Sequence, residues 1–179
     1  DIMAMDIFND KLVIGGRAGL TYMDSSAFEY DEAIRDIAFD YSFITDIDAS
    51  ANDLLIAGRG GVFRGSLTHR GWDRVISKKD LTSKRIYSIA AGSGGNLMVA
   101  TERNAFLFHE SGLILRTLFP IGLDWPVFDI KYDAGQFYLS TYYGLYVYDE
   151  ATLGFTLKAN SSGNTLPVSD DAAIDPIYE

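Results

Sequence analysis

The chain has 179 residues, of which 47% are hydrophobic and 22% are charged, a balance that is ordinary for a folded domain with a buried core. Its formal net charge of −10, from 25 acidic and 15 basic residues, argues against a protein whose main task is to hold a nucleic-acid backbone. The sequence contains no cysteine, which excludes disulfides and thiolate metal sites, and no apolar run approaches the roughly 18 residues that insertion into a bilayer requires.

A thirteen-residue phrase occurs four times in the sequence. Equivalent turn residues of the four copies are separated by 42, 43 and 40 positions. A fixed period in this range is typical of repeat architectures, in which each repeat forms one supersecondary unit. The copies begin at Leu12, Leu54, Leu97 and Phe137, and their turn residues are Gly19, Gly61, Asn104 and Gly144.

Each repeat is predicted to contain four short strands. The second strand is apolar at consecutive positions, which is typical of a strand covered on both faces. Glycine, or asparagine in the third copy, begins the third strand at a turn that favours a positive φ. In chain order the strands are predicted at 2–8, from 12, 20–23 and 30–34; at 43–49, from 54, 62–64 and 72–77; at 85–91, from 97, 105–108 and 114–118; and at 126–132, from 137, 145–148 and 155–159.

Stacked, twisted four-stranded sheets bury strands of this kind, so the sequence predicts an all-β protein, a β-propeller with four visible blades. The blades are expected at about 1–42, 43–84, 85–125 and 126–160. The segment 161–179 is predicted to be an acidic linker or the start of a further blade.

Two copies of the phrase resemble known propeller families. The fourth copy, Phe137-Tyr-Leu-Ser-Thr-Tyr-Tyr-Gly-Leu-Tyr-Val-Tyr-Asp149, resembles the repeat of two-component-regulator propellers, periplasmic sensor domains with a phrase like L-W-x-G-T-x-x-G-L-x-x-Y-D. The second copy, Gly60-Gly-Val-Phe-Arg-Gly-Ser66 followed by Gly71-Trp72, is similar to the Asp-box repeat of sialidase-like and sortilin-like propellers, but the aspartate is missing. The resemblance covers residues 1 to about 160 and implies a sensor-type propeller located outside the cell or in the periplasm.

Propellers of these families usually contain six to eight blades, as the resemblance implies. Four blades therefore leave three alternatives: a piece of a larger ring, copies that associate to complete a ring, or a small four-bladed ring. An unclosed ring would leave blade faces uncovered, which favours self-association.

The turns between second and third strands carry the candidate ligand-binding residues. Arg17 and Arg59 occupy equivalent positions, and guanidinium groups that converge there would clamp the carboxylate of a small acidic ligand, a glycan or an acidic peptide. In the alternative interpretation each arginine pairs with an aspartate of the neighbouring blade. The remaining candidates are Glu102, Arg103, Tyr142 and Tyr143 in the other two turns, and Trp125, an aromatic anchor before the fourth blade.

We expect a non-enzymatic binding module that needs neither a cofactor nor a metal. Sialidases also use three arginines from separate blades, so a sialidase-like or polysaccharide-degrading enzyme is one alternative. Against it, Arg103 is one position out of register with Arg17 and Arg59, and the spacing identifies no Tyr/Glu nucleophile pair.

A protein-interaction scaffold or assembly factor is the other alternative, because unlike charges are separated along the chain. Residues 24–48 include eight acids and one base, whereas residues 64–85 include seven bases and two acids. Surfaces of unlike charge would bind a protein partner or a second copy of the chain.

Overall fold

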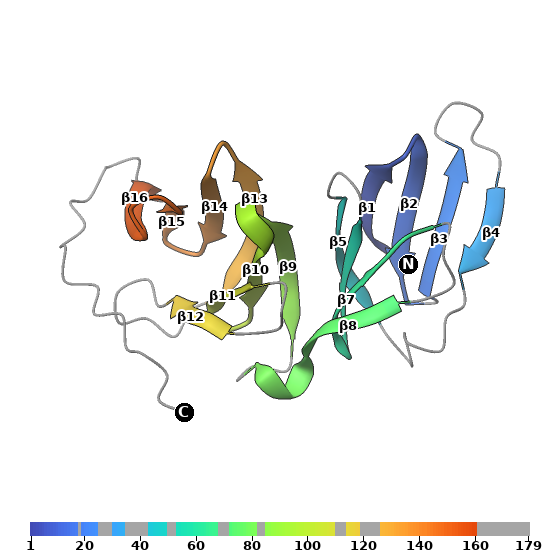
Figure 1. Ribbon diagram of the computed structural model, residues 1–179, viewed down its shortest axis with the longest axis horizontal. Coiled ribbons are helices and arrows are strands. Elements are labelled where there is room, and N and C mark those ends of the chain that lie inside the picture. The colour runs from blue at the N-terminus through green and yellow to red at the C-terminus, as the bar shows by residue number, and fades with distance from the viewer. Residues whose placement is uncertain are drawn as a thin grey trace. The chain divides into compact units, whose positions relative to one another are not determined.

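The structure is a computed structural model that describes residues 1–17, 19–24, 30–34, 43–49, 53–67, 72–81, 85–109, 114–118 and 126–160. In these ranges sixteen strands form four antiparallel sheets, each with its strands in chain order (Figure 1). We call the sheets blades 1 to 4. The predicted strands are confirmed to within one residue at each end, and two short 3-10 helices accompany them.

The strands have the following bounds. Blade 1 contains β1 (Ile2–Phe8), β2 (Lys11–Gly16), β3 (Gly19–Asp24) and β4 (Tyr30–Ile34). Blade 2 contains β5 (Ile44–Ala49), β6 (Leu54–Gly58), β7 (Gly61–Gly65) and β8 (Trp72–Ser77), followed by η2 (Lys78–Asp80). Blade 3 contains β9 (Ile86–Ala91), η3 (Ser93–Gly95), β10 (Asn96–Thr101), β11 (Ala105–His109) and β12 (Ile114–Leu118). Blade 4 contains β13 (Val127–Asp133), β14 (Gln136–Thr141), β15 (Gly144–Asp149) and β16 (Gly154–Asn160).

The chain divides into two compact units, Asp1–Ile86 (unit 1) and Tyr87–Glu179 (unit 2). In unit 1, β5 packs against β1 and β2, and Ile44 and Ile47 belong to the same buried cluster as Val13. The Ile44 side chain packs directly on Gly15, where an added Cβ would collide with Cγ2 of Ile44. Blades 1 and 2 of unit 1 therefore share one core, and a side chain at position 15 would force neighbouring atoms of this core to shift.

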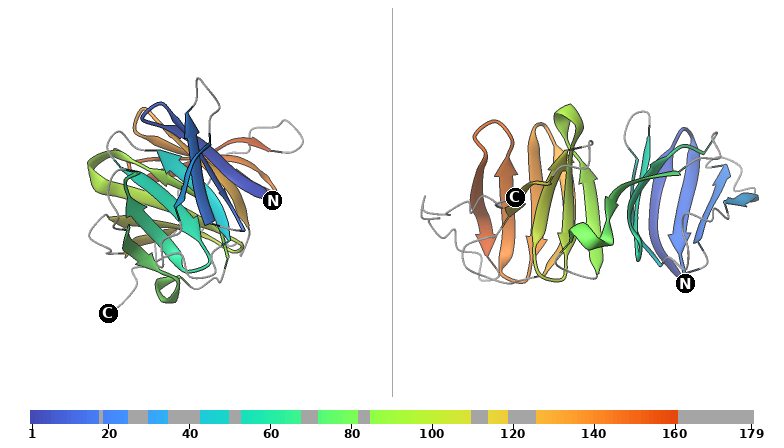
Figure 2. Two further views of the ribbon diagram at one scale, coloured as in Figure 1. Left: turned by 90° about the vertical axis from the view of Figure 1, so that its right-hand side faces the viewer. Right: turned by 60° about the horizontal axis from the view of Figure 1, so that its bottom comes forward.

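In unit 2, β10 packs against β13, and the strands of blades 3 and 4 lie side by side in Figure 2. A second core forms between them. Phe137 is fully buried in this core, together with Met98 and Ile130. The Ser88 hydroxyl lies 3.1 Å from Oδ1 of Asp129 and accepts a hydrogen bond of 3.1 Å from the backbone N–H of Ile130. Hydrogen bonds therefore reinforce the packing of blade 4 on blade 3 in this unit.

Burial of the second strands agrees with the prediction in two blades. All five residues of β6 are buried, as are five of the six residues of β10. The prediction is wrong for β2 and β14, in which buried and less buried residues alternate; Ile14 is half-buried and Ser140 is exposed. Cover on a second face must come from another sheet, and an apolar sequence does not by itself supply that sheet.

The turns before the third strands contain glycine for a conformational reason in three blades. Gly19, Gly61 and Gly144 adopt φ values of 110°, 128° and 143°, as predicted. The same expectation is wrong for Asn104, which does not adopt a positive φ. In blade 3 the Thr101 hydroxyl donates to the Asn104 carbonyl at 2.8 Å and accepts from the Asn104 N–H at 3.0 Å, and in blade 4 the equivalent Thr141 hydroxyl donates to the Gly144 carbonyl at 2.9 Å.

Glu150 links blade 3 to blade 4 in unit 2. Its Oε2 accepts hydrogen bonds from the hydroxyls of Ser93 at 2.5 Å and Tyr132 at 2.8 Å, and its Oε1 accepts one from Nδ2 of Asn96 at 2.9 Å. Burial alone would raise the pKa of Glu150, but the hydrogen bonds from Ser93, Asn96 and Tyr132 lower it below its ordinary value. The ionised carboxylate therefore stabilises the contact between these two blades.

Glu150→Gln is expected to lower the free energy of unfolding by about 1–2 kcal/mol at neutral pH, because an amide replaces the charged acceptor of these hydrogen bonds. The loss is no larger because the hydrogen bonds are partly exposed to solvent. A carboxylate whose folded-state pKa is depressed stabilises the protein above its unfolded pKa, and this contribution is lost as the pH falls through the folded value. The difference between wild type and Glu150→Gln in urea unfolding should therefore shrink as the pH is lowered from about 7 to about 3. A difference that is the same at both pH values would contradict this role.

Candidate functional site

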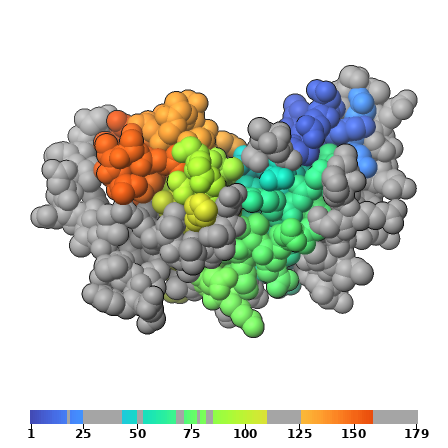
Figure 3. Space-filling model, viewed as in Figure 1, coloured from blue at the N-terminus to red at the C-terminus, as the bar shows by residue number. Residues whose placement is uncertain are grey.

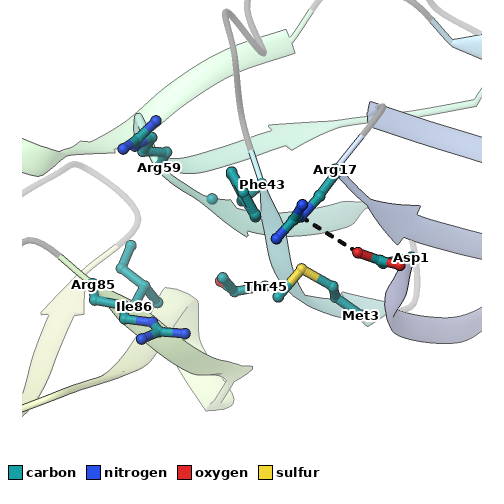
Figure 4. A pocket seen from close by; sticks show the side chains of 9 residues that line it. Asp1, Met3, Arg17, Phe43, Thr45, Arg59, Arg85 and Ile86 are labelled. Atoms are coloured by element: carbon teal, nitrogen blue, oxygen red, sulfur yellow. Dashed lines mark ion pairs between the residues drawn. The ribbon is translucent and has the colours of Figure 1, made fainter.

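Unit 1 has a pocket of about 510 Å³ beside the turns that follow β2 and β6 (Figure 4). This volume is within the range of small-molecule sites, which measure roughly 300–1,000 Å³. The predicted residues Arg17 and Arg59 both line it. The other lining residues are Asp1, Met3, Phe43, Thr45, Gly58, Arg85 and Ile86.

The repeat itself positions the two arginines. Gly16 pairs with Gly19 and Gly58 pairs with Gly61, so that each second strand joins its third strand through a turn of two residues. Arg17 and Arg59 are the first residues of these two turns, and both are exposed. Because β5 packs on β1 and β2, equivalent turns of blades 1 and 2 lie at the same pocket.

Phe43 lies between the two arginines (Figure 4). The Cζ atom of Arg17 is 4.9 Å from the centroid of the Phe43 ring, and the Cζ atom of Arg59 is 5.9 Å from it. Such cation–π contacts contribute about 0.5–1 kcal/mol each at exposed sites. The ring therefore restricts two long cationic side chains and leaves their N–H groups available for hydrogen bonds.

Arg17 also forms an ion pair within its own blade. Its Nε lies 3.4 Å from Oδ2 of Asp1, and the two side chains are 64% and 73% exposed. An exposed pair of this kind contributes little to stability. Arg17 does not form the ion pair with an aspartate of the neighbouring blade that the alternative interpretation expects. Arg59 makes no ion pair within the part of the chain that the structure describes.

Four other predicted site residues, all in the described ranges, do not line this pocket. Glu102, Arg103, Tyr142 and Tyr143 belong to turns of unit 2. The rings of Tyr142 and Tyr143 contact each other edge to face, with centroids 5.2 Å apart. Trp125 lies outside the described residues.

Sequence reasoning missed the residues that lie between and beside the arginines. Phe43 precedes β5, and Met3 and Thr45 occupy equivalent positions near the starts of the first strands of blades 1 and 2. Met3 and Thr45 could have been found from the repeat, because they directly follow Ile2 and Ile44, which are equivalent residues of the first strands. Phe43 has the same repeat position as Asp1 and Arg85, which also line the pocket, but the residue type at this position differs among the repeats, so the sequence did not single it out.

The described residues contain neither a metal-binding cluster nor a membrane-spanning helix. No group of three or more histidine, aspartate or glutamate side chains in these ranges is arranged to hold a metal ion. Within the same ranges, no helix has the length and apolar character needed to cross a membrane.

Comparison with known proteins gives structural matches and no sequence matches. No protein-family model matches the chain, and no curated protein matches it. Its structure is similar to the extracellular domain of BT4673 from B. thetaiotaomicron, described as a hybrid two-component system, with a TM-score of 0.73 and 16% identity over 92% of this chain and 23% of that one. It is also similar to the Pan2 WD40 domain of Neurospora crassa, with a TM-score of 0.65 and 14% identity over 88% of this chain and 48% of that one.

A third similar structure is the computationally designed Ika4 protein, with a TM-score of 0.62 and 14% identity over 83% of this chain and 91% of that one. The chain thus spans about a quarter of the BT4673 domain and about half of the Pan2 domain. Likeness at such low identity concerns the fold. Together with the four sheets, it shows that the chain is an all-β protein with a β-propeller fold and four blades.

Proposed function

We propose that the chain is a non-enzymatic binding module whose pocket in unit 1 recognises a small acidic ligand. The observation that carries this proposal is that Arg17 and Arg59, from equivalent turns of neighbouring blades, line one pocket. Guanidinium groups with exposed N–H donors bind carboxylates through charge-assisted hydrogen bonds. The likeness in fold to an extracellular domain of a two-component system supports a sensor role and a location outside the cell or in the periplasm.

The lining of the pocket favours binding over hydrolysis. Among the described residues that line it are one carboxylate, that of Asp1, which pairs with Arg17, and one side-chain hydroxyl, that of Thr45, which donates to the Ala57 carbonyl at 3.4 Å. Glycoside hydrolysis usually needs two carboxyl groups on opposite sides of the scissile bond. We therefore expect no turnover of sialosides or polysaccharides.

The double variant Arg17→Ala/Arg59→Ala is expected to lose stabilisation by acids. Galacturonate and citrate should raise the Tm of the wild type in a concentration-dependent way, because a ligand that binds the folded state stabilises it. The double variant should show no rise beyond that given by sodium chloride at equal ionic strength.

Arg74→Ala is the matched control for this experiment. Arg74 is also exposed and lies over a phenylalanine of unit 1, with its Cζ atom 5.3 Å from the Phe63 centroid, but it does not line the pocket. This variant should respond to acids as the wild type does. No response of the wild type to either acid, or an equal response of the double variant, would refute the proposal.

A protein-interaction scaffold is the second candidate, and the basic stretch 64–85 favours it. Arg74 and Lys79 are exposed, and β8 and η2, to which they belong, lie on the surface in green in Figure 3. Charge reversal at both residues should weaken binding to an acidic protein partner and leave the acid response of the pocket unchanged. Binding of such a partner that is insensitive to this reversal would exclude the basic stretch as its docking site.

A further inference from the structure

The arrangement of Phe43 limits how Arg17 and Arg59 can act on one ligand. A guanidinium binds a carboxylate with N···O distances of about 2.7–2.9 Å. The Phe43 ring lies between the two guanidinium groups, with their Cζ atoms 4.9 Å and 5.9 Å from its centroid, so in this arrangement the ring stands in the way of a single carboxylate that would contact both (Figure 4). The two arginines are therefore two separate anion sites and not one clamp.

Asp1 shows that a carboxylate fits beside Arg17 without any change in the arginine. Its Oδ2 lies 3.4 Å from Nε of Arg17, at ion-pair distance, so that the carboxylate faces one of the five N–H donors of the guanidinium group. The other donors point from an exposed side chain, and Arg59 offers an equivalent set. Each arginine can thus accept its own acid group from a ligand.

The surface near these two anion sites is partly apolar. The Phe43 ring is half-buried, and Met3, 42% exposed, lines the same pocket. A short aliphatic linker would cover these side chains and remove apolar surface from water. A linker rich in charge would not be stabilised by contact with these apolar side chains.

We infer that the ligand of this pocket is a small organic diacid, with one acid group on Arg17, the other on Arg59 and a short apolar linker over Phe43. This inference rests on the proposed function, and it makes the spacing between acid groups the source of specificity. The second acid binds as part of the same molecule, so its effective concentration at the second arginine is high.

Calorimetric titration with adipate and hexanoate tests the inference. The two probes have six carbons each and differ in the second carboxylate. Adipate is expected to bind at least about tenfold more tightly than hexanoate. Arg17→Ala and Arg59→Ala should each reduce adipate affinity to the level of hexanoate, whereas Arg74→Ala should leave both affinities unchanged.

The outcomes separate this inference from the proposed function. Equal, arginine-dependent affinities for adipate and hexanoate would overturn the diacid inference and leave an acid site. Binding of neither acid to the wild type would overturn both.

Asp1→Asn adds an independent readout, because it removes the carboxylate that competes for Arg17. This variant should bind adipate about two- to fivefold more tightly than the wild type does. Unchanged or weaker binding would contradict a ligand acid at Arg17.

Discussion

Phe137→Ala is expected to lower the free energy of unfolding of unit 2 by about 3–5 kcal/mol, the largest loss of stability that we expect from a single substitution. Phe137 is fully buried, and its ring lies 4.8 Å from the ring of Tyr132 and 6.4 Å from that of Tyr148, measured between centroids. It also fills the space beside Gly92, where an added Cβ would meet the Phe137 ring. Truncation would therefore leave a cavity between blades 3 and 4, which the surrounding sheets cannot close.

Urea unfolding followed by tyrosine fluorescence and far-ultraviolet circular dichroism measures this effect. Phe128→Ala is the control, because Phe128 belongs to the same blade, is 47% exposed and contacts Tyr87 at a ring distance of 6.2 Å. Its loss should stay below about 1.5 kcal/mol. Hydrogen exchange should place the destabilisation in blades 3 and 4; an effect of Phe137→Ala no larger than that of the control would contradict the assigned core.

Gly15→Val is expected to destabilise unit 1 by about 1–3 kcal/mol and to weaken acid binding at the same time. A Cβ at this position would collide with Ile44, which directly follows Phe43, and Gly15 itself lies two residues before Arg17. Blades 1 and 2 must shift to admit the side chain. Such a shift would move Arg17 relative to Phe43, and small displacements disturb a preorganised site.

Thermal unfolding and adipate titration of the same sample measure both effects. Gly154→Ala is the control, because the nearest atom to an added Cβ there is Oγ1 of Thr152 at 3.4 Å, an ordinary contact. This control should change neither the Tm nor adipate affinity appreciably. A Gly15→Val protein with wild-type Tm would show that blades 1 and 2 do not pack through this glycine.

The strands could be predicted from the repeat because the position of each strand depends on the residues in and next to it. Turn glycines with positive φ and short apolar runs recur at a fixed period, and the structure has a strand at each predicted place. Burial was less predictable. Ile2 and Ile44 are equivalent in sequence, yet Ile2 is 65% exposed and Ile44 is fully buried, because the cover for a first strand comes from a neighbouring sheet.

The candidate site was predictable in part for a similar reason. The period placed Arg17 and Arg59 at equivalent turns, and in unit 1 equivalent turns of packed blades lie together. The convergence of the arginines on one carboxylate stays a prediction, and in the structure Phe43 lies between their guanidinium groups. The period also places Phe43, directly before Ile44, but it does not specify an aromatic side chain there, because the equivalent residues are Asp1, Arg85 and Pro126.

The central claim is that Arg17 and Arg59 together bind one acidic ligand, and nuclear magnetic resonance of arginine side chains tests it most directly. The Nε–Hε signals of Arg17, Arg59 and Arg74 would be followed during titration with adipate, after assignment with the single variants. We predict that the signals of Arg17 and Arg59 shift along curves with the same Kd while that of Arg74 stays in place. Signals that do not shift, or that shift equally for all three arginines, would contradict a ligand site at this pocket.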